Sequence, residues 1–384
     1  MKIVHLSNDE KFVPLARSLF DEAFPGMNRW LLARLRPGER RHVAAASDVS
    51  HHHSLRFRTR WIARQLADAD CVVVHLMSSR FAPALRHVRP GTLVVWLAGG
   101  GDYMPLLEPR LGSLVLPRTA ELLRALAQRA PARGGWWRRL RAPWRRAKAQ
   151  PPPTLPAMAV APRIDVLSAN PADARLLSEV LPSLHAVLHP IPSFTVEDIF
   201  AAGTADMAGP DLQLGNSCSP TNNHLEALAL LRGRLPEGCR VLVPLSYGKA
   251  PPGYAQAVID AGREMLGARF EPLTDWLPIG DYNQRMARCG WVLMNQRRQQ
   301  AVGNIAAALY RGASVYMRRD NPLFGFFCDL GITLLAIEEL EADPAAALCE
   351  LSPGQRQANR CAIEARYGRA QVVAAIRALE GYRR

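Results

Sequence analysis

The chain has 384 residues, of which 48% are hydrophobic and 21% are charged, and its formal net charge is +14. This composition is that of an ordinary globular protein of about two domains, long enough to bury a large core without staples. The seven cysteines are scattered and form no CxxC pair, which argues against a disulfide framework or a zinc site and suits a reducing compartment.

The ends and apolar runs of the chain predict neither a signal peptide nor a membrane span. The opening MKIVHLSND turns charged within its first ten residues. No apolar run reaches the ~18 residues that a spanning helix needs. We therefore expect a soluble or peripheral protein.

The first half of the chain alternates strand-like and helix-like stretches. Residues 2–7, 71–77 and 92–101 are apolar runs that end in polar or glycine loops, and helical patterns fit 54–68 and 80–87. Continuous apolar strands separated by helices indicate a parallel sheet covered on both faces. The runs 164–170 and 186–192 are expected to add strands to the same sheet.

A second alternation follows a basic and proline-rich break at residues 131–162. The expected strands are 212–217, 240–248, 269–273, 291–296 and 314–319, and the expected helices are 222–234, 253–266, 280–288, 303–311 and 354–380. Two doubly wound α/β halves predict a ligand at the carboxyl ends of the strands.

Three stretches of the second half could contact a ligand. In LGNSCSPTNNHLEALALL (214–231), a polar loop leads from a strand into a helix; it could hold an anion, or it could simply cap the helix. In RRQQAVGNIAAALYRG (297–312), Gly303 and Asn304 open an apolar helix beside Arg298, although an ordinary turn has the same pattern. RRDNPLF (318–324) follows the next strand; Asp320 and Asn321 before Pro322 are typical of a turn, and they could also accept a hydrogen bond from a sugar hydroxyl.

The first half offers fewer groups with chemistry. WLAGGGDY (96–103) places three glycines and Asp102, a possible general base, just past a strand. His75 ends the neighbouring strand, where a lone histidine is commonly structural. The run HHH (51–53) is interpreted as a surface loop, because adjacent residues in regular structure cannot all face one metal ion.

The second half resembles a known family. GNSCSPTNNHLEAL (215–228), VLVPLSYG (241–248) and the two arginine-containing stretches at 297–312 and 318–324 follow in the order and spacing typical of the bacterial TDP-N-acetylfucosamine:lipid II transferases. These enzymes transfer 4-acetamido-4,6-dideoxygalactose in enterobacterial common antigen synthesis. The resemblance covers about residues 211–335 and is weaker upstream, where VVVHL and VVWLAGGGDY are similar to the family's segments.

The resemblance implies a GT-B fold, in which two Rossmann-like parallel-sheet domains face each other across a cleft. We accordingly expect an acceptor-binding and membrane-associating domain over 1–205, a nucleotide-sugar-binding domain over 206–350, and C-terminal helices over 351–384 that pack back toward the first domain.

Carried over by motif, the resemblance also implies a donor site. Its expected residues are Gly215, Asn216, Ser217, Asn223, His224, Tyr247, Gly248, Arg298, Gln299, Gln300, Gly303, Asn304, Asn321 and Pro322. The family has acidic residues where this chain has Cys218 or Ser219, and again at Asn223, and a threonine-like residue at Asn304. These departures leave open a related dideoxy-amino sugar as the donor.

The expected reaction needs neither a cofactor nor a metal. A helix N-terminus and Arg298 would stabilise the charge that builds on the leaving nucleoside diphosphate. Asp102 or His75 would take the proton of the acceptor hydroxyl, and the acceptor would be a polyprenyl-diphosphate-linked oligosaccharide. Three alternatives stay open: a transferase of another nucleotide-deoxyamino-sugar for O-antigen or capsule, a non-catalytic nucleotide-sugar-binding relative, and a nucleic-acid-binding protein. No nucleic-acid motif is visible, so we expect no such partner.

The basic charge concentrates in one stretch. No acid occurs between Glu121 and Asp165, and RGGWWRRLRAPWRRAK (133–148) lies in that interval. On a helix its apolar residues would share one side, as in a helix lying on an anionic membrane, although Pro143 should kink it and a solvated loop remains an alternative. The expected membrane contacts are Trp136, Trp137, Arg138, Arg139, Leu140, Arg141, Trp144, Arg145 and Arg146. This predicts a peripheral protein at the cytoplasmic face of the bacterial inner membrane.

Overall fold

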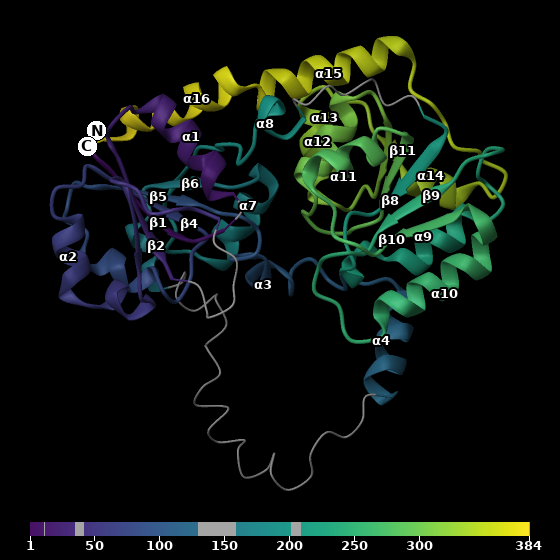
Figure 1. Cartoon of the computed structure of the whole chain (residues 1–384), viewed down its shortest axis with the longest axis horizontal. Helices are drawn as coiled ribbons and strands as arrows, with labels where there is room; N and C mark the ends of the chain where they lie inside the picture. The colour runs from purple at the N-terminus through teal and green to yellow at the C-terminus, as the bar shows by residue number, and fades with distance from the viewer. Residues whose placement is uncertain (11, 35–41, 130–158, 201–208, 384) are drawn as a thin grey trace, which may run out of the picture. The chain divides into compact units, whose positions relative to one another are not determined.

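The computed structural model describes residues 1–10, 12–34, 42–129, 159–200 and 209–383 (Figure 1). The basic tryptophan stretch and the membrane contacts expected on it lie outside these residues. The described chain forms two compact units. Unit 1 contains residues 1–110, 159–195 and 366–383, and unit 2 contains the described residues of 111–129 and 196–365.

Unit 1 is built on a seven-stranded sheet in which every strand pairing is parallel. In spatial order its strands are β3 (Val49–His52), β2 (Asn28–Ala33), β1 (Ile3–Asn8), β4 (Cys71–His75), β5 (Leu93–Leu97), β6 (Val166–Ser168) and β7 (Val187–Leu188). Its helices are α1 (Val13–Ala23), α2 (Arg60–Leu66), α3 (Met104–Leu107), α7 (Pro171–Val180) and α16 (Arg369–Arg377), with short 3-10 turns η1 (Ser54–Arg58), η2 (Ala82–His87), η3 (Ala161–Arg163) and η6 (Ala378–Tyr382).

Alternate residues of the unit 1 strands form a buried core under α1 and α16. This core contains Ile3, Cys71, Val73 and Val95 of the strands and Phe20 of α1. Helices α1 and α16 contact each other above it, as Figure 1 shows. Strands buried on both faces explain why the sequence shows continuous apolar runs here rather than alternation.

Unit 2 contains a six-stranded sheet that is also parallel throughout. In spatial order its strands are β10 (Phe270–Leu273), β9 (Val241–Pro244), β8 (Asp211–Leu214), β11 (Cys289–Met294), β12 (Ser314–Met317) and β13 (Leu335–Ala336). Its helices are α4 (Pro117–Arg129), α8 (Val196–Phe200), α9 (His224–Leu231), α10 (Tyr254–Leu266), α11 (Ile279–Met286), α12 (Val302–Tyr310), α13 (Pro322–Asp329), α14 (Ile337–Ala342) and α15 (Pro353–Tyr367), with turns η4 (Pro220–Asn222) and η5 (Gly267–Arg269).

The predicted fold class of two parallel-sheet α/β halves is confirmed. The expected central strands occur in both sheets, and the expected C-terminal helix is divided at Gly368 into α15 and α16. Strands β2 and β3 were not predicted. The structure also places His51 and His52 on edge strand β3, so the interpretation of that run as a surface loop was wrong.

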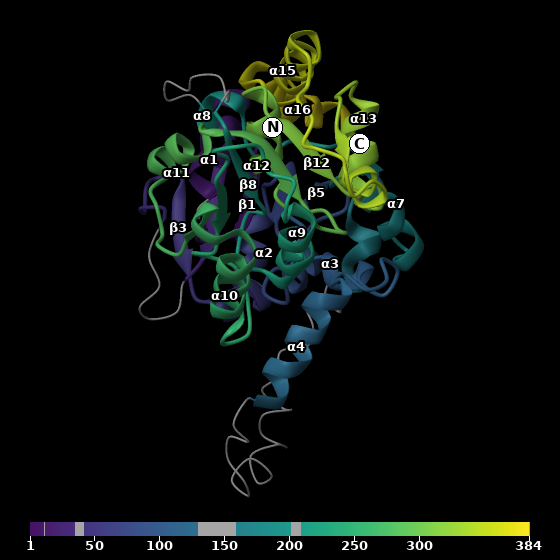
Figure 2. The same cartoon turned by 90° about the vertical axis from the view of Figure 1, so that its right-hand side faces the viewer.

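Helix α4 belongs to unit 2, although the sequence analysis assigned its residues to the first domain. It packs against α9 and α10 (Figures 1 and 2). The carboxylate of Glu226 accepts hydrogen bonds from the backbone N–H of Thr119 at 2.9 Å and from its hydroxyl at 2.6 Å. Glu226 therefore stabilises the first turn of α4, where the backbone N–H groups lack partners within the helix.

Within the described residues, no helix combines the length and the apolar character that crossing a bilayer requires.

The packing of α10 on β10 depends on a glycine. A Cβ at Gly262 would lie 2.2 Å from the Phe270 ring, which is buried in the unit 2 core. We predict that Gly262→Ala lowers the free energy of unfolding by about 1–3 kcal/mol, because the ring must move in a close-packed core. Urea denaturation measures the change. Gly280→Ala on α11 is the matched control, since nothing lies within 4 Å of its added Cβ. Unchanged stability in Gly262→Ala would contradict this packing argument.

Candidate active site

Polar loops gather at the carboxyl edge of the unit 2 sheet. Strand β8 lies between β9 and β11, and Leu214, its last residue, pairs with Leu293 of β11. Since parallel strands end at the same edge, the loops that follow β8, β9, β11 and β12 meet there. These loops contain most of the predicted donor-binding residues.

The loop after β8 begins with a turn that only glycine fits. Gly215 has φ 65°, and a Cβ there would lie 2.8 Å from Oδ1 of Asn222. The Asn222 side chain is fully buried and occupies this space. Its Oδ1 accepts from the backbone N–H of Asn216 at 3.2 Å, and its Nδ2 donates to the Ser217 carbonyl at 2.9 Å. Asn222 thus fixes the path of residues 215–217.

Side-chain amides join this loop to the one after β11. Gln296, which is fully buried, donates from Nε2 to Oδ1 of Asn222 at 2.7 Å. Gln300 donates to Oδ1 of Asn216 at 2.9 Å, and Asn216 donates to the Tyr247 hydroxyl at 3.0 Å. Buried polar groups that satisfy one another rigidify a site. We call Asn216, Asn222, Gln296 and Gln300 the amide cluster.

Sequence reasoning missed Asn222 and Gln296 as site residues. Gln296 and Asn295 are polar side chains directly after the buried apolar run of β11, at the carboxyl edge. That position was a usable signal. No signal in the sequence indicated the role of Asn222, because that role depends on filling the space above Gly215.

Two predicted donor-binding residues have buried side chains bound within the protein. Asn223 has φ 51°, and its amide donates to the Asn295 carbonyl at 3.0 Å and accepts from the Leu116 N–H at 2.8 Å. His224 contacts the Tyr254 hydroxyl through Nδ1 at 3.0 Å, and burial lowers its pKa to about 4. Both geometries favour a positioning role over direct contact with a ligand.

Asn321 also positions the backbone. As the N-cap of α13, its Oδ1 accepts from the Leu323 N–H at 3.0 Å, and Pro322 occupies the first helical turn. Its Nδ2 donates to the carbonyls of Gln296 at 2.9 Å and Arg298 at 3.0 Å. Asn321 therefore holds residues 296–298 in the conformation that leads to α12.

The accessible members of the predicted donor site surround the start of α12. Partly or well exposed side chains or backbones at this edge are Tyr247, Gly248, Arg298, Gln299, Gln300, Gly303 and Asn304. Ala301 precedes α12 with φ 62°, and no acidic residue lies in the first turn of the helix. Helix α12 thus begins directly after a loop whose conformation the amide cluster holds. Its N-terminus is the positive end of the helix dipole.

The two arginines before α12 have different surroundings. Arg297 donates to Asp320 at 2.6 Å and to the Ser113 carbonyl at 2.8 Å, so a carboxylate already offsets its charge. Arg298 donates to the Gln299 carbonyl at 3.3 Å, directly beside the loop that enters α12. Arg298 therefore lies next to the start of α12, whereas Arg297 is bound to Asp320 and Ser113. At the other side, Asn304 donates to the Tyr282 hydroxyl at 3.2 Å.

Asp102, a predicted base in unit 1, is almost fully buried. Its Oδ2 accepts from the Met77 N–H and from the Trp96 indole N–H, each at 2.8 Å, and its Oδ1 accepts from the Gly99 N–H at 3.1 Å. Burial raises the pKa of this carboxyl, and the three hydrogen bonds oppose that shift. Proton transfer would disrupt these bonds, so the geometry favours a role for Asp102 in holding the loops after β4 and β5.

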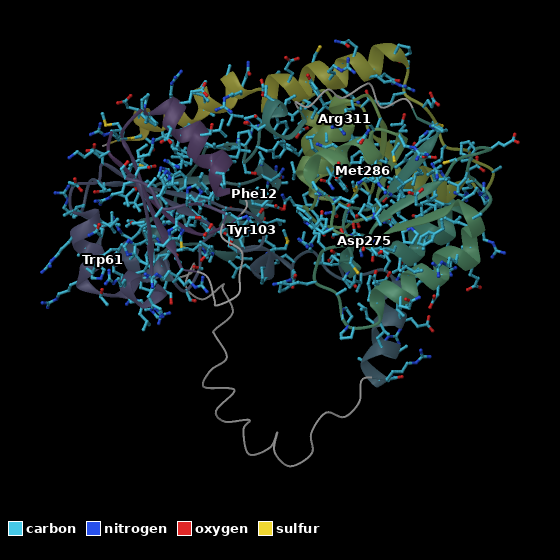
Figure 3. The ribbon with its side chains drawn as sticks, viewed as in Figure 1. Phe12, Trp61, Tyr103, Asp275, Met286 and Arg311 are labelled. Carbon is cyan, nitrogen blue, oxygen red and sulfur yellow. The ribbon has the colours of Figure 1, made fainter. Side chains whose placement is uncertain are left out.

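His75, the other predicted base, lines a cavity of about 230 Å³ in unit 1. Its Nε2 lies 3.0 Å from Nδ1 of His5, and burial lowers the pKa of His75 to about 3. Phe12, at the cavity, and Tyr103, beyond β5, both follow the carboxyl ends of strands and are labelled in Figure 3. Asp102 and His75 have different partners and form no dyad with each other.

In the described part of the chain, no group of three or more His, Cys, Asp or Glu side chains is placed to hold a metal ion. His51 instead lies 3.4 Å from the buried carboxylate of Asp9.

Comparison with known proteins identifies related sequences and folds. Residues 195–347 match the family described as 4-alpha-L-fucosyltransferase glycosyl transferase group 56. Sucrose-phosphate synthase from Thermosynechococcus elongatus is similar in structure, with a TM-score of 0.59, 11% identity and 97% of each chain covered. The UDP-forming α,α-trehalose-phosphate synthase from Burkholderia xenovorans in complex with glucose-6-phosphate gives 0.59, 10% identity and 100% coverage of both chains.

A third similar structure is the N-terminal domain of trehalose-6-phosphate phosphatase from Candida albicans. It has a TM-score of 0.61 and 7% identity, and the match covers 99% of this chain and 97% of that one. At such identities the likeness shows the fold alone. The two parallel sheets and these neighbours show the GT-B fold. Over residues 195–347 the chain is therefore similar to a family of glycosyltransferases.

The hydrogen bonds of Asp102 predict a structural effect for Asp102→Asn. An amide must turn its NH₂ group toward at least one of the three N–H donors, which leaves buried donors without an acceptor. We expect the free energy of unfolding to fall by about 1–3 kcal/mol in urea denaturation. Asp275→Asn, at an exposed position in Figure 3, should leave stability unchanged. Wild-type stability in Asp102→Asn would argue for a role other than holding these loops.

Proposed function

We propose that the protein transfers a 4-acetamido-4,6-dideoxyhexose from a dTDP-sugar to a polyprenyl-diphosphate-linked oligosaccharide in surface polysaccharide synthesis. The observation that carries this proposal is the start of α12, where Arg298, Gln299, Gln300 and Gly303 surround a helix N-terminus in a loop held by the amide cluster. The family match covers this region and the resemblance in its motifs supports the sugar class.

The proposed chemistry follows from charge. Breaking the bond between the anomeric carbon and the diphosphate leaves negative charge on the nucleoside diphosphate. A helix dipole and a guanidinium that are already in position before the reaction stabilise that charge, because neither has to reorganise as the bond breaks. The amide cluster keeps this loop rigid, because its side-chain amides form hydrogen bonds with one another and with the backbone. Tyr247 and Gly248, after β9, are proposed to contact the sugar from the neighbouring loop.

The donor sugar itself is proposed from the resemblance. The matching family's name specifies fucose, whereas the motif resemblance indicates its 4-acetamido-4,6-dideoxy relative. GDP-fucose and dTDP-4-acetamido-4,6-dideoxygalactose are therefore the two donors to compare, with UDP-sugars as a further group.

The acceptor and the location are proposed from charge and from the substrate class. A net charge of +14 suits an anionic membrane surface, and a polyprenyl-linked acceptor resides in such a membrane. We propose peripheral attachment at the cytoplasmic face of the inner membrane through residues 131–150, which lie outside the described chain.

A transfer assay tests the function. The purified full-length protein is incubated with each donor and with a polyprenyl-diphosphate-linked disaccharide, and mass spectrometry follows the acceptor. We expect a mass increase of one 4-acetamido-4,6-dideoxyhexose from the dTDP-sugar only. Transfer from GDP-fucose or from a UDP-sugar instead would overturn the proposed donor. A protein that binds nucleotide sugars but modifies no acceptor would be the non-catalytic relative.

We predict that the Arg298→Ala substitution lowers the affinity of the protein for the nucleotide. Replacing Arg298 by Ala removes a charged donor for the diphosphate, which is worth about 1.5–3 kcal/mol, or roughly 10-fold to 150-fold in affinity. Isothermal titration with dTDP measures it. Arg319→Ala is the matched control, because Arg319 is exposed and paired with Glu339. Equal affinities of both variants for dTDP would remove Arg298 from the proposed site.

A further inference from the structure

Three polar side chains form a hydrogen-bonded chain across strands β2, β1 and β4 of unit 1. His5 of β1 lies at the centre, between Asn28 of β2 and His75 of β4. Its Nε2 is 3.1 Å from Oδ1 of Asn28, and its Nδ1 is 3.0 Å from Nε2 of His75. His5 is fully buried and stacks on Trp30 with ring centroids 3.8 Å apart. A polar side chain buried in the same strand as the core residue Ile3 costs free energy unless it is hydrogen-bonded, so packing alone does not explain His5.

The surroundings of Asn28 determine where the protons are. Its Nδ2 donates to the carbonyls of Phe20 at 3.0 Å and Phe24 at 2.8 Å and to Asp21 at 3.0 Å. These acceptors orient the amide so that Oδ1 faces His5. His5 must then donate from Nε2, because Oδ1 can only accept.

The same reasoning continues to His75. A neutral His5 that carries its proton on Nε2 presents a lone pair at Nδ1, so Nε2 of His75 must be the donor across the 3.0 Å contact. Neutral His75 then has its lone pair on Nδ1. Burial lowers the pKa of His5 well below its usual range and that of His75 to about 3, so both rings are neutral at ordinary pH.

His75 also contributes to the wall of the unit 1 cavity. Most of that wall is apolar and includes Phe12, Leu19, Leu76 and Ile191. Among the hydrogen bonds of the described residues, the one made by the His75 ring joins its Nε2 to His5, and none involves Nδ1. The cavity therefore suits a ligand with a hydroxyl group beside an apolar face.

We propose that His5 and Asn28 are positioning residues that hold the proton of His75 on Nε2, so that Nδ1 accepts the proton of an acceptor hydroxyl bound in this cavity. The catalytic step rests on the proposed transferase function. The acceptor oxygen bonds to the anomeric carbon, the bond from that carbon to the diphosphate breaks with its electron pair leaving on the phosphate, and the hydroxyl proton moves to Nδ1. The resulting imidazolium then releases a proton to water.

A base of low pKa is sufficient for this step. Once the acceptor oxygen begins to bond to the anomeric carbon, its proton becomes strongly acidic, so a weak base can remove it late in the reaction. We call the hydrogen-bonded set of Asn28, His5 and His75 the relay. It keeps His75 neutral and keeps the lone pair on Nδ1, so that this nitrogen is always able to accept a proton.

Nitrogen-15 NMR of the histidine-labelled full-length protein tests the relay without any substrate. We expect Nδ1 of His75 to show the shift of an unprotonated nitrogen and Nε2 that of a protonated one, with the signals assigned by their loss in His75→Phe. A His75 protonated on Nδ1 in the wild-type protein overturns the proposal, whatever any variant does.

Two substitutions test whether His5 acts through His75. His5→Phe keeps a ring against Trp30 but removes both nitrogens, so His75 should populate both tautomers and kcat should fall at least tenfold with the acceptor KM unchanged. Asn28→Asp should favour a charged His5 and thereby move the His75 proton to Nδ1. His185→Phe, at an exposed position of the same unit, should change neither the His75 signals nor turnover.

The outcomes separate the relay from the proposed function. A wrong donor or acceptor abolishes transfer in every protein, wild type included, while the His75 spectrum still supports or contradicts the relay. Where the wild-type protein transfers sugar, wild-type kcat in folded His5→Phe overturns the positioning role. If His5→Phe does not fold, Asn28→Asp and the wild-type spectrum decide the question.

Discussion

The side chain of Asn222 fills the space above Gly215 and bonds to both ends of the turn that follows β8. Through Oδ1 it also receives the Gln296 amide from the loop after β11, so one buried side chain joins two loops at the carboxyl edge of unit 2. The position of Gln300 depends on this arrangement through Asn216. The loop that leads into α12 therefore takes its conformation from amide contacts made several residues away.

Unit 1 uses buried polar groups in the same way, with different chemistry. Asp102 ties Met77, Trp96 and Gly99 together, and His5 connects Asn28 to His75. A buried polar group costs free energy unless it is paired, so each such set specifies one arrangement of the backbone around it. In both units the regular core places strands, while a few buried polar side chains determine the loops beyond them.

This division explains what the sequence could predict. Apolar runs such as 71–77 and 291–296 indicate buried parallel strands directly, because burial on both faces leaves no alternation. Strand β2 was missed, since NRWLLA follows α1 after a short turn and carries a polar start. Segment 111–129 was assigned to the wrong unit by its place in the chain, because its attachment depends on Glu226 and Asn223, more than a hundred residues away.

The candidate site was predictable to the level of loops and not of individual side chains. Motifs pointed to the start of α12 and the loop after β8. They also assigned Asn223, His224 and Asn321 to contact with the donor, whereas all three side chains are buried and bound within the protein. Nothing local distinguishes an amide that meets a ligand from one that meets a backbone carbonyl. That difference is set by tertiary partners.

The departure at Asn223 illustrates the consequence. Read as a motif, an amide in place of the family's acidic residue suggested a change in the donor sugar. In the structure, Nδ2 of Asn223 donates to the carbonyl oxygens of Asn295 and Leu114, at 3.0 and 3.2 Å. A carboxylate here would oppose those carbonyls with a second acceptor and a buried charge, which is costly. The amide is therefore explained by the attachment of residues 114–116 to the sheet edge, and it does not by itself indicate a different donor sugar.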